Sequence, residues 1–172
     1  MTDGAVGGDE RVAGGDGGGG GGAGIVRGVH HVGASVADLG AAIAFWEPFL
    51  GAPPRFRGRL SRPYLGESVG HPGVEIDAAL IDLPGGGLLE LLEYRLDGRE
   101  QTPDDTKHPG NVHLCLAVGD IGAVWARAVG LGARPVRAAG PVEIDAGPNA
   151  GARAAYLRVH DGISLELFQV PG

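Results

Sequence analysis

The stretch Val29-His30-His31-Val32-Gly33-Ala34-Ser35-Val36-Ala37-Asp38-Leu39 decides how this chain is interpreted. Its side chains alternate up to Val36, which predicts a short β-strand with Val32, Ala34 and Val36 on one face. Asp38 is a good helix N-cap, and the apolar stripe after it predicts a helix over residues 39–50. The stretch is therefore expected to be a strand that leads directly into a helix.

A second copy of this pattern begins at His113. A shift of 82 residues pairs His31 with His113, and Asp38 with Asp120. A shift of 76 residues pairs Leu89-Glu90-Leu91 with Leu165-Glu166-Leu167. The change of shift falls in loops, whose length varies at little energetic cost. The chain is therefore predicted to contain two copies of a strand–helix–strand–strand–strand unit, which makes it an α+β protein.

The repeat also predicts the domain organisation. Residues 1–24 are dominated by glycine and are expected to form a disordered tail. Residues 25–95 are expected to form the first module, residues 96–110 a polar linker and residues 111–172 the second module. Within the first module, residues 52–72 are expected to hold one short strand and a mobile loop.

Composition excludes several classes of partner. The net charge is −7 and no basic patch stands out, so nucleic acid is not an expected partner. No apolar run is long enough to span a membrane, and a membrane is not an expected partner of this protein. The single cysteine, Cys115, excludes an intrachain disulfide and fits the cytoplasm. A cluster of arginines, Arg55, Arg57, Arg59 and Arg62, is expected to be solvated rather than to bind an anionic substrate.

Each unit places one histidine at the start of its first strand and one glutamate in its last strand. Alternation puts Glu90 on the face opposite to Leu89 and Leu91, where the apolar residues are expected to pack beneath a helix. A glutamate among leucines is costly to bury unless it is paired or bound to a metal. Both residue types recur at matched repeat positions, which favours a mixed nitrogen and oxygen site for one divalent metal. Its candidate ligands are His31, Glu90, His113 and Glu166.

The neighbouring residues receive other assignments. His30 falls on the helix-facing side and is expected to be an edge residue or a support for His31. Glu93 has the parity opposite to Glu90 and is expected to be a surface residue. Cys115 is expected to face the cavity, but nucleophilic catalysis is not expected because no base neighbours it in sequence.

The chain resembles the vicinal oxygen chelate superfamily, which includes glyoxalase I, methylmalonyl-CoA epimerase, extradiol dioxygenases and bleomycin-type resistance proteins. The resemblance covers about residues 26–170. It implies paired βαβββ modules forming a cupped mixed β-sheet with helices on the outer face. It also implies the same four ligand positions around one zinc, nickel, cobalt, manganese or iron ion. The motifs that carry it are His30-His31-Val32-Gly33 with Asp38-Leu39, Leu89-Glu90-Leu91-Leu92-Glu93, His113-Leu114 with Val118-Gly119-Asp120, and Asp161-Gly162-Ile163-Ser164-Leu165-Glu166-Leu167.

Because all four ligand positions are filled, the chain resembles the glyoxalase and epimerase branches more than the others. These branches imply an isomerase, epimerase or lyase that abstracts a proton next to a metal-bound carbonyl of a small metabolite. The candidate bases are Glu166, Glu90 and His71, which stands where methylmalonyl-CoA epimerases carry a base glutamate. The alternatives are an iron(II) extradiol-type dioxygenase and a non-catalytic natural-product-binding resistance protein.

The expected partners are a small-molecule substrate and a second copy of the chain in a homodimer. The sequence leaves open whether the two modules pair within one chain or between two chains.

Overall fold

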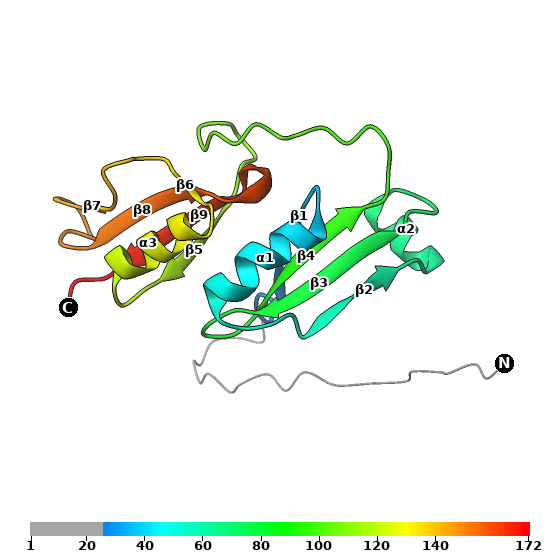
Figure 1. Ribbon diagram of the computed structural model, residues 1–172, viewed down its shortest axis with the longest axis horizontal. Helices are drawn as coiled ribbons and strands as arrows, with labels where there is room; N and C mark the ends of the chain where they lie inside the picture. The colour runs from blue at the N-terminus through cyan, green and yellow to red at the C-terminus, as the bar shows by residue number, and fades with distance from the viewer. Residues whose placement is uncertain (1–25) are drawn as a thin grey trace.

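The computed structural model describes residues 26–172, so the tail expected at residues 1–24 lies outside the described residues. The α+β class and the two βαβββ units are confirmed (Figure 1). The elements in chain order are β1 (His31–Ser35), α1 (Leu39–Leu50), β2 (Phe56–Leu60), α2 (Pro63–Val69), β3 (Ile76–Asp82), β4 (Leu88–Tyr94), β5 (His113–Ala117), α3 (Ile121–Gly130), β6 (Arg134–Pro135), β7 (Val142–Glu143), β8 (Arg153–Arg158), the 3-10 helix η1 (His160–Gly162) and β9 (Ser164–Gln169).

Each module forms its own mixed sheet. The strand order is β1-β4-β3-β2 in the first module and β5-β9-β8-β6 in the second, where β7 also pairs with β8. Strand β1 runs parallel to β4 and pairs Gly33 with Glu90, while β5 runs parallel to β9 and pairs Cys115 with Glu166. The internal repeat therefore holds at the level of strand register.

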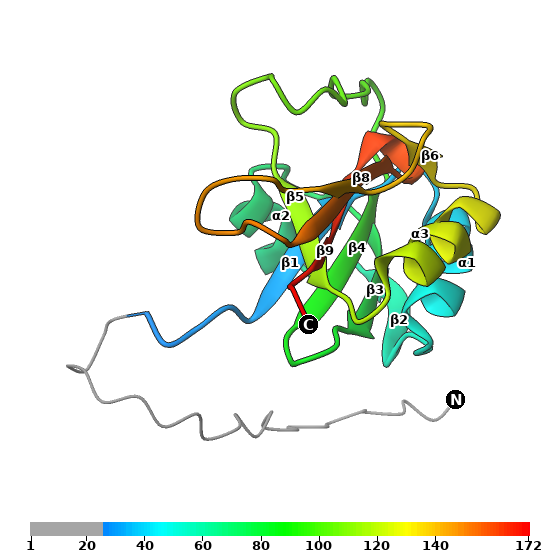
Figure 2. The ribbon, with the colours of Figure 1, turned by 90° about the vertical axis from the view of Figure 1, so that its left-hand side faces the viewer.

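The two sheets lie side by side, and each is covered on one face by its own helix. Helix α1 contacts β3 and β4, and α3 contacts β8 and β9. Figures 1 and 2 show both helices on the same side of the molecule. The faces that the helices leave uncovered, here called the open faces, therefore lie together on the other side.

The core sits between the sheets and the helices, and it runs through both modules. Leu89 and Leu91 are buried in the first module, as Leu165 and Leu167 are in the second. This is the face predicted from alternation in β4 and β9. Trp46 of α1 is fully buried. Among the helices described between residues 26 and 172, none combines the length and the apolar character needed to cross a membrane.

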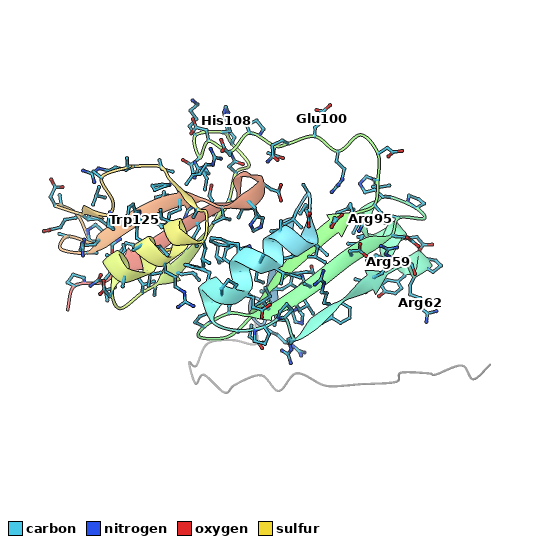
Figure 3. All side chains as sticks on the ribbon, viewed as in Figure 1. Arg59, Arg62, Arg95, Glu100, His108 and Trp125 are labelled. Carbon is cyan, nitrogen blue, oxygen red and sulfur yellow. The ribbon has the colours of Figure 1, made fainter. Side chains whose placement is uncertain are left out.

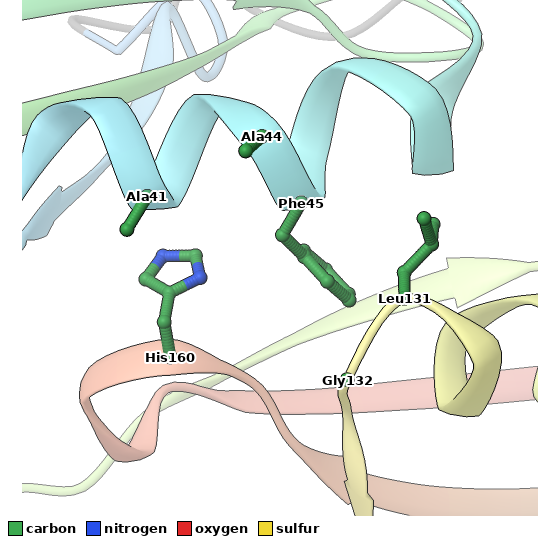
Figure 4. A pocket seen from close by; sticks show the side chains of 6 residues that line it. All are labelled: Ala41, Ala44, Phe45, Leu131, Gly132 and His160. Atoms are coloured by element: carbon green, nitrogen blue, oxygen red, sulfur yellow. The ribbon is translucent and has the colours of Figure 1, made fainter.

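Helix α1 also holds the second module. The Trp46 indole Nε1 donates a hydrogen bond to His160 Nε2 of η1 at 3.3 Å, and burial lowers the pKa of His160. Arg127 of α3 donates to the Pro48 carbonyl oxygen. Beside these contacts is a cavity of about 200 Å³ between the modules (Figure 4). The lining residues are Ala41, Ala44, Phe45, Leu131, Gly132 and His160.

The last strand of each module caps its helix. The Leu39 backbone N–H donates to Glu93 Oε2 at 2.8 Å, and the Ile121 N–H donates to Gln169 Oε1 at 2.9 Å. The expectation that Glu93 is a surface residue is wrong, because it is only 9% exposed. Its parity points it toward the helix side, where the unpaired N–H groups at the start of α1 need an acceptor.

The segment between α1 and β3 contains more structure than expected. The short strand is present as β2, but much of the remainder forms helix α2 rather than a loop. Pro63 starts this helix, as proline favours the first helical turn. A Cβ atom on Gly66 would lie 2.6 Å from the His71 carbonyl oxygen, so only glycine lets α2 pack this closely on the following loop.

The arginine cluster is engaged in ion pairs. Arg59 Nε lies 2.7 Å from Asp77 Oδ1, and Arg95 also pairs with Asp77. Figure 3 shows Arg59 and Arg95 on the first module. Hydrogen bonds from Arg59 and Arg95 hold the pKa of Asp77 well below its usual range. Arg55 pairs with Asp82 at 3.2 Å. Two of the four clustered arginines are therefore neutralised by neighbouring carboxylates.

We expect Glu93→Ala to lower the free energy of unfolding by about 1–3 kcal/mol, because the Leu39 N–H loses its acceptor. Glu93→Gln should cost less than half as much, since it reproduces the neutral cap that Gln169 provides in the second module. Urea denaturation at neutral pH measures both losses. Glu93 Oε1 also lies 3.1 Å from Arg95 Nη1. Equal losses in the two variants would show that this ion pair, and not the cap, is the stabilising contact.

Candidate functional site

The first predicted pair of ligands meets on the open face of the first module. His31 Nε2 lies 3.3 Å from Glu90 Oε2, and both side chains are partly exposed. His30 lies beside this pair, with its Nδ1 2.8 Å from His31 Nδ1. One ring nitrogen of His31 is thus engaged by a neighbour, and the other faces the carboxylate. This is the arrangement that orients a metal-binding histidine.

The second predicted pair repeats this geometry. His113 Nε2 lies 2.9 Å from Glu166 Oε2 on the open face of the second module. A third group joins it, because the Tyr156 hydroxyl oxygen lies 3.4 Å from the same Nε2. The rings of His113 and Tyr156 also pack edge to face, with centroids 5.3 Å apart.

The surroundings of the two pairs differ. Tyr156 of β8 stands opposite Glu166 and Leu80 of β3 stands opposite Glu90, since these positions match in register. Tyr156 is not among the site residues predicted from the sequence. The internal repeat could have identified Tyr156, because the shift of 76 residues that aligns Glu90 with Glu166 also aligns Leu80 with Tyr156.

Neither Cys115 nor Tyr156 is ionised at neutral pH. Burial, together with the nearby Glu166 carboxylate, raises the pKa of Cys115 to about 11. Burial, together with a hydrogen bond to Glu166, raises the pKa of Tyr156 to about 12. Both side chains therefore act as hydrogen-bond donors, which agrees with the expectation that Cys115 is not a nucleophile.

The donor atoms of each pair suit a divalent transition metal. Imidazole nitrogen and carboxylate oxygen are ligands for such ions, and in each pair the two atoms face one another with no cationic side chain between them. The structure brings each pair together but does not gather all four residues. Within residues 26–172, no group of three or more His, Cys, Asp or Glu side chains is arranged to hold a metal. We call each pair a half-site.

His71 lies at the end of β4. It is exposed after α2, and its ring packs against Tyr94 with centroids 6.2 Å apart. Tyr94 has the same strand parity as Glu90, four residues earlier in β4, so the two side chains leave the same face of the sheet. His71 stays a candidate base.

The raised pKa of Cys115 leads to a test of the second half-site. At pH 8 we expect iodoacetamide to alkylate Cys115 at least several-fold more slowly than a free cysteine, because its thiolate fraction is smaller. Glu166→Gln should speed alkylation, since it removes the nearby negative charge. Mass spectrometry follows this single thiol directly. A rate equal to that of N-acetylcysteine would contradict the described environment.

Comparisons with known proteins agree with this architecture. Residues 30–156 match the family model of the glyoxalase/bleomycin resistance protein/dioxygenase superfamily. A 2-epi-5-epi-valiolone epimerase from Actinomyces is 35% identical over 152 residues, which cover 83% of this chain and 79% of that protein.

Two solved structures share the fold. A glyoxalase family protein from Bacillus cereus superposes with a TM-score of 0.71 at 22% identity, covering 87% of this chain and 98% of its own. The fosfomycin resistance protein FosX from Listeria monocytogenes, solved with Mn(II) and a dihydroxypropylphosphonic acid, gives a TM-score of 0.57 at 14% identity, covering 83% and 92%. On the strength of the family model and the epimerase relative, the chain belongs to the glyoxalase/bleomycin resistance/dioxygenase superfamily.

Proposed function

We propose that this protein is a divalent-metal-dependent epimerase that removes and returns a proton on the carbon next to a carbonyl group of a small metabolite. The observation that carries the proposal is the pair of matched half-sites, His31 with Glu90 and His113 with Glu166. The relative named as an epimerase supports this reaction over the lyase, dioxygenase and resistance alternatives. When bound, the metal would act as a Lewis acid that makes the hydrogen beside the carbonyl more acidic.

The four side chains have different roles in metal binding and proton transfer. His31 and His113, as neutral imidazoles, would hold the metal together with the two carboxylates. Glu166 takes the proton from the substrate carbon. Glu90, which comes from the other half-site, takes a proton from solvent and delivers it to the opposite face of that carbon, so the configuration inverts. Glu166 then releases its proton to solvent, so both carboxylates are restored and no net proton is gained or lost. His71, whose ring packs against Tyr94, is not required by this scheme.

We further propose that a second copy of the chain completes each site. The open faces of both sheets lie on the same side of the molecule (Figure 2), so a two-fold axis can set the first half-site of one chain against the second half-site of the other. The edge strands β1 and β5 carry the two histidines, and the residues just before them expose apolar surface. Val29 is 77% exposed and Val112 is 82% exposed. Such a dimer contains two complete sites.

Isotope exchange tests the reaction. Protein loaded with Mn(II), Zn(II), Ni(II) or Co(II) is incubated with 2-epi-5-epi-valiolone in D₂O, and NMR follows deuterium incorporation and epimer formation. We expect exchange beside the carbonyl, and a loss of at least about a hundredfold in Glu166→Gln because the base is removed. Glu143→Gln, an exposed glutamate of β7, is the matched control and should leave the rate unchanged.

Two results would contradict the proposed reaction. Undiminished exchange in Glu166→Gln would remove that residue from the role of base. Oxygen consumption by the iron(II) form on a catechol, without isotope exchange, would instead mark a ring-cleaving oxygenase.

Mixing of variants tests the shared site. His31→Ala and His113→Ala should each bind Mn(II) weakly, because every site in either homodimer lacks one ligand. After the two chains are mixed and allowed to exchange subunits, half of the dimers are mixed, and each mixed dimer has one intact site. Titration followed by electron paramagnetic resonance should then find about a quarter of the wild-type tight sites.

The control mixes His31→Ala with Glu90→Gln, two lesions in the same module, which cannot restore an intact site. If His31→Ala with His113→Ala also restores none, the four ligands do not come from two chains.

A further inference from the structure

Tyr156 is the main chemical difference between the two half-sites. It occupies the position opposite Glu166 in the β8–β9 ladder, and the matching position opposite Glu90 holds Leu80. The internal repeat keeps the histidine, the glutamate and the register, yet places a phenol on one side and an isobutyl group on the other. The first module folds with Leu80 at this position and therefore without a hydroxyl group there. The hydroxyl of Tyr156 is therefore not required by the fold that the two modules share.

The contacts of Tyr156 place its hydroxyl among the candidate ligand atoms. The hydroxyl oxygen lies 3.4 Å from His113 Nε2, and that same nitrogen lies 2.9 Å from Glu166 Oε2. The edge-to-face packing of Tyr156 on His113 fixes the direction of the phenol. Phenol oxygen, imidazole nitrogen and carboxylate oxygen thus converge on one point of the open face.

The chemistry of these three groups is unequal. An ionised carboxylate only accepts hydrogen bonds, and a ring nitrogen that binds a metal has no proton to donate. The neutral phenol offers one O–H donor. If Nε2 of His113 binds a metal, it no longer accepts from the phenol, so the O–H can be donated to the remaining Glu166 oxygen or to a substrate oxygen that enters the half-site.

We propose that the Tyr156 hydroxyl is a substrate-binding and specificity-determining group, which donates a hydrogen bond to a substrate oxygen atom beside Glu166. The site then takes substrates with an oxygen substituent near the reacting carbon on the side that faces the second module, such as hydroxy ketones. Leu80 leaves the side that faces Glu90 apolar. This proposal rests on the proposed function, since it concerns the substrate of the same site.

Ligand binding to the Mn(II)-loaded protein tests the role of Tyr156 without turnover. The probe is acetohydroxamate, a small ligand that presents two oxygen atoms. We expect Tyr156→Phe, which keeps the ring on His113, to hold Mn(II) within about twofold of wild type but to weaken acetohydroxamate about five- to tenfold. Tyr64→Phe is the matched control, because it removes a hydroxyl from an exposed tyrosine of α2 and should change neither affinity.

Turnover of 2-epi-5-epi-valiolone gives a second reading, in which Tyr156→Phe should raise KM at least as much as it lowers kcat. Unchanged acetohydroxamate affinity would overturn the proposal for Tyr156, even in an active epimerase. An equal loss of Mn(II) affinity would also overturn it, because the phenol would then only position the ligands.

The results that would contradict the proposed function differ from those that would contradict the role of Tyr156. Protein that binds Mn(II) and shows the expected loss of acetohydroxamate in Tyr156→Phe, but exchanges no deuterium, supports the assignment of Tyr156 and contradicts the epimerase. Protein that binds no Mn(II) contradicts both.

Discussion

The alternation of side chains along the last strand of each module is the constraint on which the rest of the structure depends. In β4 it sends Leu89, Leu91 and Glu93 toward α1 and leaves Glu90 on the open face. A slip of one residue would bury Glu90 beneath the helix and expose two core leucines. The same register therefore builds the core, caps the helix and presents the carboxylate. Structural and candidate functional residues alternate along a single strand. A change of register that moves one set therefore also moves the other.

Much of this arrangement could be predicted from the sequence because it is local and occurs twice. Asp38 and Asp120 cap their helices by accepting from backbone N–H groups three residues later, as expected. That His31 and Glu90 lie on the same face of the sheet followed from strand parity and from the repeat. Other features depend on contacts that parity does not specify. Parity gave the face of Glu93, but the N–H group that it meets there depends on how α1 sits over β4.

The remaining features were out of reach for different physical reasons. Helix α2 is short, and it is built around a glycine that matters only because the next loop packs against it. The position of Tyr156 could have been found from the repeat, but its contact with His113 appears only when β8 and β9 are in register. The four candidate ligands are split between two sheets that do not bring them together within residues 26–172. In the proposed dimer, a second chain joins the pairs, which a sequence pattern does not specify. The repeat preserved the scaffold of the half-sites, while the residues opposite the glutamates diverged.

The contact between Trp46 and His160 affects how new combinations of half-sites could arise after gene duplication. It fastens the two modules of one chain through their helix side and leaves both open faces available to another chain. In the proposed dimer, each site then combines half-sites from two chains. If a cell carried a second, diverged copy of the gene, mixed dimers would combine one first half-site with a foreign second half-site. Two genes would in that case yield four kinds of site, and new substrate preferences could arise by recombination of subunits before any further mutation.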